Sequence, residues 1–531
     1  MDRAPIGYIL KSAAPGRRAL KRLEVRFRAR RQPYPPHRTT WLDTFDGRLL
    51  EDGASLAFEE AQGQSSLAWR DAEGLIRHGH AAQKQPLFAE DLPAGPLRER
   101  AAAVIGVRRL FPVARTESAG ETLRLLDRNN RTILRIDLER IEALHATRDT
   151  RRPLAPRLRL TPSPGSRAIL EDVREVLESD TGLARDTGSI VREAMEAAGA
   201  GPRPAKARPA LTPGLRAADA AVRIHRALLA TLRRNERGAR EALDAEFLHD
   251  YRVAVRRTRT ALAQMRGVFP KSAETRFARD FRWLGTLTNP ARDMDVFRIA
   301  LADHALLLPA PLRRDIDPLI AFVIARQQAE QRKLAEGLRS ARCRSLIGDW
   351  TRFLRSKPRR SAAAPDADRP ILEVASERIA DRFARVIRKA EKLKGRSSDQ
   401  KFHKLRVECK KLRYLLEFFK DLYRAEEVES FVAPLKKLQD MLGEFNDLRV
   451  QRGMLRPFAR DLARTDGAPV ECLIAVGRLE ERLQQRQDKL RKRSRKRFAE
   501  WMEARTAERL ASMLSAPRGT KAGAAGEALT A

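Results

Sequence analysis

The spacing of apolar residues changes along the chain near residue 200. Residues 1–198 contain alternating, β-branched and aromatic segments between turn signals such as Asn129-Asn130, which predicts mainly strands. Apolar residues at helical spacing in 166–180 predict a closing helix packed on a sheet. From Leu215 onward, long segments rich in Ala, Leu, Arg and Glu repeat with helical periodicity. The pattern predicts an α+β chain, with a strand-rich first domain and an all-α second domain.

Two breaker-rich stretches, 199–214 and 356–370, have the composition of linkers. The last residues contain too few large apolar side chains to pack, so we expect a disordered tail at 514–531. The predicted organisation is therefore a first domain at 1–198, a linker at 199–214, a helical domain at 215–513 and the tail.

The helical domain contains an internal repeat at a constant offset of 154 residues, which is the difference between the numbers of the paired positions. The first block of matches pairs His249/His403, Arg252/Arg406, Arg256/Lys410, Arg257/Lys411 and Arg259/Arg413. Without a gap, the same offset pairs Leu284/Leu438 and Asp293/Asp447. Two separate blocks in one register indicate two copies of one helical unit, 215–355 and 371–513.

In each copy, the histidine and three cations fall on one stripe of a helix, opposite the apolar residues. The stripes consist of His249, Arg252, Arg256 and Arg259, and of His403, Arg406, Lys410 and Arg413. Arginine offers a fork of donors that fits phosphate oxygens, and lysine adds a mobile charge. Like charges at i, i+4 cost roughly 0.2–0.5 kcal/mol per pair, so an uncompensated stripe indicates a ligand that supplies counter-charge.

The candidate binding residues are the basic and imidazole side chains of the two matched helices: His249, Arg252, Arg256, Arg257, Arg259, His403, Arg406, Lys410, Lys411 and Arg413. Weaker candidates are Arg282, Lys436 and Lys437, because ordinary surface cations look the same. The alternative for one basic helix is a solvated face, and for the histidines a structural role. Duplication at a fixed offset favours binding. The basic segment 483–501 has no match in the repeat, and we interpret it as an exposed helix.

Charge narrows the choice of partner. The formal charge is +36, from 106 Lys and Arg against 70 Asp and Glu, and residues 1–200 account for only +6 of it. The remaining +30 lies in the predicted helical half, so that half is expected to bind an anionic partner. Nonspecific nucleic-acid binding stays open on charge alone. Aromatic residues form only 6% of the chain, and none alternates regularly with the basic stripe, so base stacking has little support.

The three cysteines, Cys343, Cys409 and Cys472, are far apart and form no CxxC motif. We therefore expect neither a disulfide framework nor a structural zinc site, and no cofactor. No segment has the apolar run of a signal peptide or a spanning helix, so the expected location is the cytoplasm.

The repeated motif of His, Arg-Val, a basic pair and Arg resembles the CHAD family, the conserved histidine α-helical domain. It is matched by 249–259 and by 403–413. The family's second signature, an Arg-Asp or Asn-Asp turn after a helix, is matched by 291–295 and 442–447, which we expect to shape helix ends. The resemblance covers about 215–513. It implies two pseudo-symmetric four-helix bundles whose basic faces line a groove for inorganic polyphosphate, and association with polyphosphate granules.

The first domain resembles the CYTH, or triphosphate-tunnel, family in the segment 40–50. The resemblance implies a mainly antiparallel β-barrel or sheet. Three features depart from the family pattern. The first 30 residues contain only Asp2 and Glu24 as acids, the later segment 56–60 carries Glu59 and Glu60 where cations are usual, and 156–160 lacks the Glu-x-Glu pair. Without paired carboxylates, no divalent ion would bridge a triphosphate, so we expect this domain to be inactive.

The sequence therefore predicts a polyphosphate-binding protein that is not an enzyme. Two alternatives stay open, a metal-dependent triphosphate or polyphosphate hydrolase acting through the first domain, and a nonspecific nucleic-acid-binding protein.

Overall fold

The computed structural model divides the chain into two units, Met1–Ala205 and Lys206–Ala531. It describes residues 6–71, 74–79, 84–144, 150–163, 167–179, 183–186, 188–199, 210–356, 363–392, 399–465, 468–503 and 506–515. Most of the predicted linker at 199–214 and nearly all of the predicted tail at 514–531 lie outside these residues.

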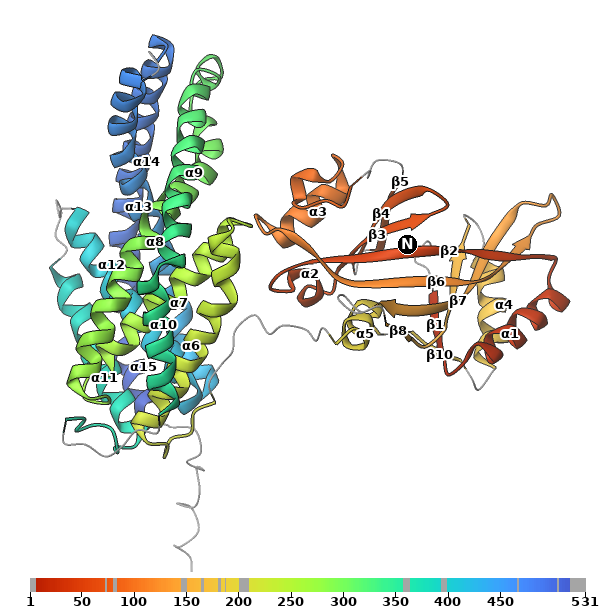
Figure 1. Cartoon of the computed structure of the whole chain (residues 1–531), viewed down its shortest axis with the longest axis horizontal. Coiled ribbons are helices and arrows are strands. Elements are labelled where there is room, and N and C mark those ends of the chain that lie inside the picture. Colours follow the sequence, from red (N-terminus) through yellow and green to blue (C-terminus); the bar gives the residue numbers. More distant parts are fainter. Residues whose placement is uncertain are drawn as a thin grey trace, which may run out of the picture. The chain divides into compact units, whose positions relative to one another are not determined.

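The described strands of the first unit form one ten-stranded sheet in which every pairing is antiparallel (Figure 1). The spatial order is β10 (Leu183–Arg185), β1 (Ile6–Leu10), β9 (Arg157–Pro162), β7 (Thr132–Leu144), β6 (Leu110–Leu126), β2 (Ala29–Thr44), β3 (Ser55–Ala61), β4 (Gln64–Asp71) and β5 (Gly74–Gly79). The short strand β8 (Arg151–Pro153) pairs with β7.

Successive side chains of β7 and β9 point to opposite faces of the sheet, one apolar and one charged. Ile136, Leu138 and Leu158 are buried in a core together with residues of α1 (Ala13–Arg26) and α4 (Arg167–Glu178). The other helices of this unit are α2 (Arg48–Glu51), α3 (Pro96–Ile105), α5 (Ile190–Ala197) and a 3-10 turn, η1 (Ala89–Asp91). A Cβ atom at Gly120 of β6 would lie 1.8 Å from the Leu138 carbonyl oxygen, so only glycine fits this approach.

The other face of the same strands carries paired charges. The Arg159 guanidinium lies 3.6 Å from a Glu139 carboxylate oxygen, and Arg135 lies 2.9 Å from Asp137. Asp137 also accepts a hydrogen bond from Thr122 at 2.6 Å. Charges on this face therefore balance one another locally.

The second unit is helical. Its first repeat contains α6 (Ala217–Arg240), α7 (Ala245–Gln264), α8 (Lys271–Ala305), η2 (Ala310–Arg313), α9 (Asp317–Arg339) and α10 (Ala341–Arg355). Its second repeat contains α11 (Ile371–Glu391), α12 (Asp399–Phe419), η3 (Lys420–Leu422), α13 (Ala425–Thr465), α14 (Val470–Glu503) and α15 (Thr506–Ser515). Successive long helices pack against one another within each repeat, and α7 packs against α12 between the repeats.

The repeat offset seen in the sequence reappears as contacts between equivalent residues. Arg216 and Pro370, 154 residues apart, form an isolated antiparallel bridge where the two repeats begin. Each repeat also has an aromatic core around one tryptophan, Trp350 beside Phe277 and Phe281, and Trp501 beside Phe383. The two copies therefore face each other about a local pseudo-twofold axis.

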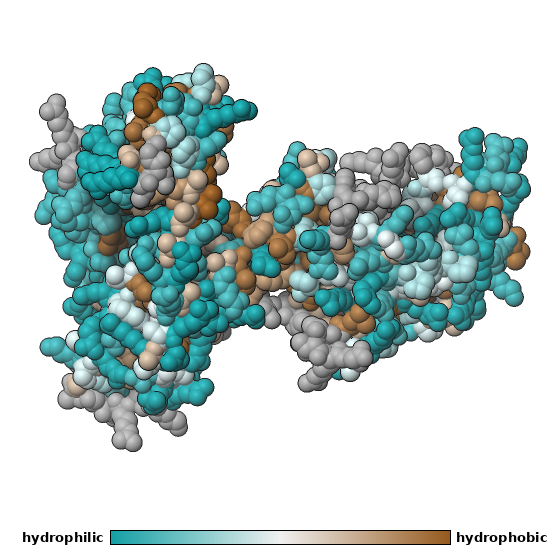
Figure 2. Space-filling view, turned by 45° about the horizontal axis from the view of Figure 1, so that its top comes forward, coloured by the Kyte–Doolittle hydropathy of each residue, from teal (hydrophilic) through white to brown (hydrophobic). Residues whose placement is uncertain are grey.

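The predicted fold class is confirmed: an antiparallel sheet domain precedes a helical domain with an internal repeat. Hydrophilic residues cover most of the visible surface of both units (Figure 2). One detail was wrong. Residues 291–295 lie inside α8 and 442–447 inside α13, rather than at turns after helices, because the long helices continue past Pro290 and Gly443. None of the described helices combines the length and the apolar run needed to cross a bilayer.

Candidate functional site

The two predicted basic stripes lie on α7 and α12, the helices that meet between the repeats. Asp244 starts α7 by accepting hydrogen bonds from the backbone N–H groups of Glu246 and Phe247. Phe247 and Tyr251 bury the opposite side of α7, and Leu405 and Leu412 do the same for α12. The apolar sides fix both helices in the unit, which turns their cations toward the boundary between the repeats.

Four half-buried cations from the two helices form what we call the central cationic cluster: Arg252, Arg256, Arg406 and Lys410. Burial lowers the pKa of Arg252 to about 10, with a further lowering from Arg256. Burial and the neighbouring Arg406 and Arg256 lower the pKa of Lys410 to about 7. Arg406 and Lys410 of the second repeat therefore sense the positive charge of Arg256 in the first.

Tyr414 of α12 joins the two stripes. Arg256 Nε donates a hydrogen bond to the Tyr414 hydroxyl at 2.8 Å, and the Arg256 guanidinium lies 5.8 Å from the ring centroid. Arg257 and Arg413 lie 5.5 and 5.6 Å from the same centroid. Arg257 also pairs with Glu417 at 3.1 Å. One buried ring thus supports three guanidinium groups from both repeats.

The change Tyr414→Phe is expected to keep the ring under the guanidinium groups but to remove the acceptor for Arg256. We expect a loss of about 0.5–1.5 kcal/mol in unfolding free energy, the ordinary net value of one hydrogen bond. Arg256 should also become more mobile, so ligand affinity should fall several-fold. Denaturant unfolding and a binding titration of the same variant measure both effects. Unchanged affinity would show that the Tyr414 hydroxyl does not position Arg256.

The two histidines of the motif contact residues of the second signature. His249 Nδ1 lies 3.1 Å from an Arg292 guanidinium nitrogen, and His403 Nδ1 lies 2.9 Å from Asn446 Oδ1. Burial, followed by the adjacent Arg292, lowers the pKa of His249 to about 4. His249 is therefore neutral at neutral pH and accepts from Arg292, which positions a cation instead of adding one.

The basic stripes are partly compensated, contrary to the expectation of an uncompensated stripe. Burial raises the pKa of Asp293, Arg252 opposes this shift, and Asp447 of the other repeat raises it again. Asp447 likewise interacts with Arg406 and Lys410. Asp293 lies in α8 and Asp447 in α13, at equivalent positions of the two repeats. The cluster keeps an excess of positive charge because its four cations face three carboxylates, those of Asp293, Asp295 and Asp447.

Several predicted residues lie outside this cluster. Arg259 is exposed and interacts with Arg282, another exposed cation. Lys411 donates to Glu408 at 3.1 Å and is directed away from the cluster by that contact. Lys436 and Lys437 are exposed on α13. The structure therefore brings together about half of the predicted set.

Sequence reasoning missed Tyr414, Arg292 and Asn446 as members of the site. Arg292 and Asn446 carried a signal, since they occupy equivalent positions in the repeat. Tyr414 carried none beyond its place next to Arg413, because the equivalent residue in the first copy is Thr260.

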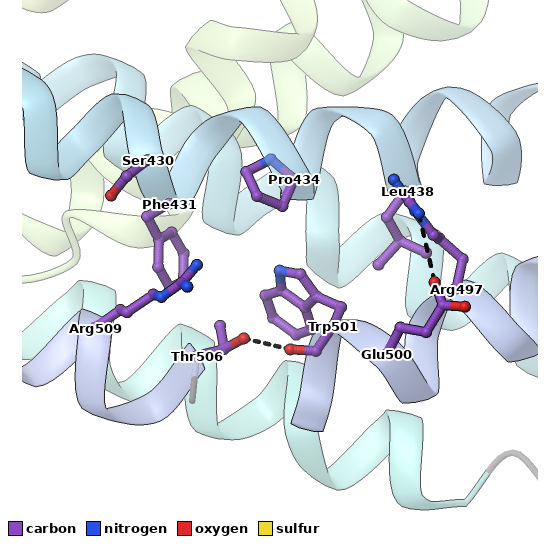
Figure 3. A pocket seen from close by; sticks show the side chains of 9 residues that line it. All are labelled: Ser430, Phe431, Pro434, Leu438, Arg497, Glu500, Trp501, Thr506 and Arg509. Carbon is purple, nitrogen blue, oxygen red and sulfur yellow. Dashed lines mark hydrogen bonds and ion pairs between the residues drawn. The ribbon is translucent and has the colours of Figure 1, made fainter. Parts of the chain in front are cut away.

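Two cavities open elsewhere in the described residues. A cavity of about 170 Å³ lies between α13, α14 and α15, lined by Phe431, Trp501 and Arg509 among others (Figure 3). Two of its polar groups have partners: Arg497 pairs with Glu500, and the Thr506 hydroxyl donates to the Trp501 carbonyl. Arg509 also lines this cavity, and its side chain is exposed.

A larger cavity, of about 820 Å³, opens in the first unit. Its charged lining consists of three arginines and three glutamates: Arg38, Arg140, Arg151, Glu60, Glu117 and Glu142. Glu117 pairs with both Arg38 and Arg151 at 2.7 Å. This lining is close to neutral, unlike the central cationic cluster. Within the described part of the chain, no three His, Cys, Asp or Glu side chains gather where they could hold a metal ion.

Comparison with known protein families gives a match within the second unit, which contains the central cationic cluster. The family model described as the CHAD domain matches residues 223–456, which lie in the second unit. The match begins in α6 and ends inside α13, and it includes both basic motifs. No curated protein sequence matches the chain.

Solved structures similar to parts of the chain include the CHAD domain from the plant Ricinus communis, at 27% identity and a TM-score of 0.45, covering 54% of this chain and 95% of that one. A "putative adenylate cyclase" from Bacillus halodurans is 13% identical with a TM-score of 0.27, covering 36% of this chain and 98% of that one. A "putative adenylyl cyclase" from Hippeastrum, described as having a dominant triphosphatase activity, is 12% identical with a TM-score of 0.26, covering 37% of this chain and 95% of that one.

Proposed function

We propose that the second unit binds inorganic polyphosphate through the central cationic cluster. One observation carries the proposal. Arg256 of α7 lies close enough to Arg406 and Lys410 of α12 to affect their charge, so cations of the two repeats come together. A row of cations with a rigid geometry suits a linear ladder of phosphates, since each guanidinium can contact two oxygens.

A bound polyanion would also offset the unfavourable free energy of holding these cations together in a half-buried site. The cluster holds four half-buried cations against Asp293, Asp295 and Asp447, and burial disfavours the charged forms of Arg252, Arg406 and Lys410. Phosphate oxygens replace the lost water and complete the charge balance. Binding to polyphosphate granules in the cytoplasm would follow from this affinity, and we propose that location as well.

The test is a titration of the full chain with long-chain polyphosphate at several salt concentrations, with duplex DNA as competitor. We expect polyphosphate to displace DNA at equal phosphate concentration. A flexible polyphosphate chain can reach the half-buried cations of the cluster, whereas a stiff DNA duplex cannot. Displacement in the reverse direction would favour nucleic acid as the ligand and overturn the proposal.

We further propose that the first unit is not a catalyst. Its charged face pairs Arg159 with Glu139 and Arg135 with Asp137, so these carboxylates are already engaged by arginines. Metal-dependent release of phosphate from triphosphate by the purified chain would contradict this proposal and favour the hydrolase alternative.

Affinity for polyphosphate is expected to fall as pH rises above 7. The pKa of Lys410 is about 7 in the empty site, and a bound phosphate raises it, so binding above pH 7 requires proton uptake. The loss should approach about tenfold per pH unit if one proton is taken up. Dissociation constants measured at constant ionic strength from pH 6 to pH 9 give the slope.

The matched control for this pH dependence is Lys410→Arg, because a guanidinium keeps its charge throughout the range. The variant should bind with a nearly flat profile. An equal slope in the variant would assign the pH dependence to another group.

A further inference from the structure

We propose that the outward face of α14 is a second polyphosphate-binding surface, which binds a different segment of a long polyphosphate chain from the one held by the central cationic cluster. This inference rests on the proposed function. We call the surface the outer basic face and define it by Lys489, Lys492, Arg493 and Lys496.

The four cations share one side of the helix. At 100° per residue, the positions i, i+3, i+4 and i+7 fall within an arc of about 100° and span about 10 Å along the axis. All four side chains are exposed. Across the residues that the structure describes, none of the four makes an ion pair, whereas nearby Arg497 and Arg491 pair with Glu500 and Asp399.

This arrangement is unfavourable without a ligand. The face contains four like-charge pairs at i, i+3 or i, i+4, each costing roughly 0.2–0.5 kcal/mol. The residues lie more than one turn before the helix end at Glu503, too far for the helix dipole to offset the repulsion. The helix is held in place instead by Leu490, Phe498 and Trp501 on its buried side. An external polyanion would supply the missing counter-charge.

The outer basic face is separate from the central cationic cluster. Gln487 donates to Asp399 of α12, and Arg491 of α14 pairs with the same carboxylate. These two residues lie on the opposite side of α14 from the four cations, so the face is directed away from α12. A short chain held at the cluster cannot also cover this face. A long chain can reach both, which raises its affinity through effective concentration.

The composition of the face favours polyphosphate over single-stranded nucleic acid. Its exposed residues include no aromatic side chain, because Phe498 and Trp501 are on the buried side of the helix. Stacking of bases therefore has no platform, and only phosphate contacts remain. The first repeat shows no similar face on α9, where Lys333 is paired with Glu330 at 2.9 Å.

The experiment compares short-chain and long-chain polyphosphate binding to the full chain and to two variants. The outer-face variant replaces the four cations by glutamine: Lys489→Gln, Lys492→Gln, Arg493→Gln and Lys496→Gln. The matched control replaces four exposed cations scattered over the first repeat: Lys271→Gln, Arg332→Gln, Arg339→Gln and Arg355→Gln. Glutamine has nearly the helix propensity of lysine and arginine, so the helix is expected to persist.

We expect the outer-face variant to bind short chains within about twofold of the parent and long chains at least ~10-fold more weakly, as loss of bivalent contact requires. The control variant should lose much less for long chains. Equal losses in the two variants would overturn the second surface while leaving the proposed function intact. Failure of the parent to bind either length would overturn both. A loss confined to duplex DNA, with long-chain polyphosphate unaffected, would assign the face to nucleic acid and also overturn the inference.

Discussion

Removing the four charges of the central cationic cluster is expected to lower polyphosphate affinity by at least ~10³-fold, because a hydrogen bond to a charged group contributes about 1.5–3 kcal/mol. The variant is Arg252→Ala, Arg256→Ala, Arg406→Ala and Lys410→Ala. The salt dependence should weaken as well, since fewer counterions are released from the ligand. Titration at several salt concentrations measures both quantities.

The control for this prediction is a variant with the same loss of charge at exposed sites, Lys271→Ala, Arg332→Ala, Arg339→Ala and Arg355→Ala. This control should lose only the long-range electrostatic attraction between the chain and polyphosphate, which salt screens. If both variants weaken binding equally, the cluster is no more than part of a general basic surface.

The cluster variant leaves Asp293 and Asp447 with fewer cationic neighbours, which could lower stability. A milder variant, Arg256→Gln with Lys410→Gln, keeps Arg252 and Arg406 beside the two acids. It should stay folded and still lose at least ~10-fold in affinity, the equivalent of about 1.4 kcal/mol. Full affinity in this folded variant would exclude the cluster as the binding site.

The largest expected loss of stability comes from Arg382→Ala. Arg382 of α11 is buried and donates hydrogen bonds to Glu408 of α12 and to Gln264 of α7, so it links both repeats. Its removal leaves a buried carboxylate short of one partner, which typically costs about 3–5 kcal/mol. Denaturant unfolding followed by the helical circular dichroism signal measures the change.

The neighbouring exposed residue provides the matched control: Arg385→Ala on the same helix should change the unfolding free energy by no more than ~0.5 kcal/mol. The double variant Arg382→Met with Glu408→Leu should recover much of the loss, since no buried charge remains. A single variant as stable as the Arg385 control would show that the contact contributes nothing.

The same network predicts how stability depends on pH. Burial alone would raise the pKa of Glu408, but the hydrogen bonds from Arg382 and Lys411 hold it below the ordinary value. A depressed carboxyl pKa in the folded state gives stability that is complete above the unfolded pKa and is lost as pH falls through the folded value. The contribution of Glu408 should therefore disappear in acid.

The amino-acid sequence determined the division into a strand-rich and a helical part, because periods of two and 3.6 residues are properties of the local pattern. It also determined the repeat, since His249 and Asp293 match His403 and Asp447 at one offset. The helical pattern also put Arg256 on the predicted basic face of its helix, and Arg256 donates to Tyr414 of the second copy.

Only the tertiary structure decided which cations act together. Lys410 and Lys411 are adjacent in sequence, yet packing leaves one among arginines and pairs the other with Glu408. The role of Tyr414 depends on α7 and α12 lying side by side, a contact between residues 158 positions apart. Such contacts are set by how the buried faces of two helices fit, which no local pattern of residues encodes.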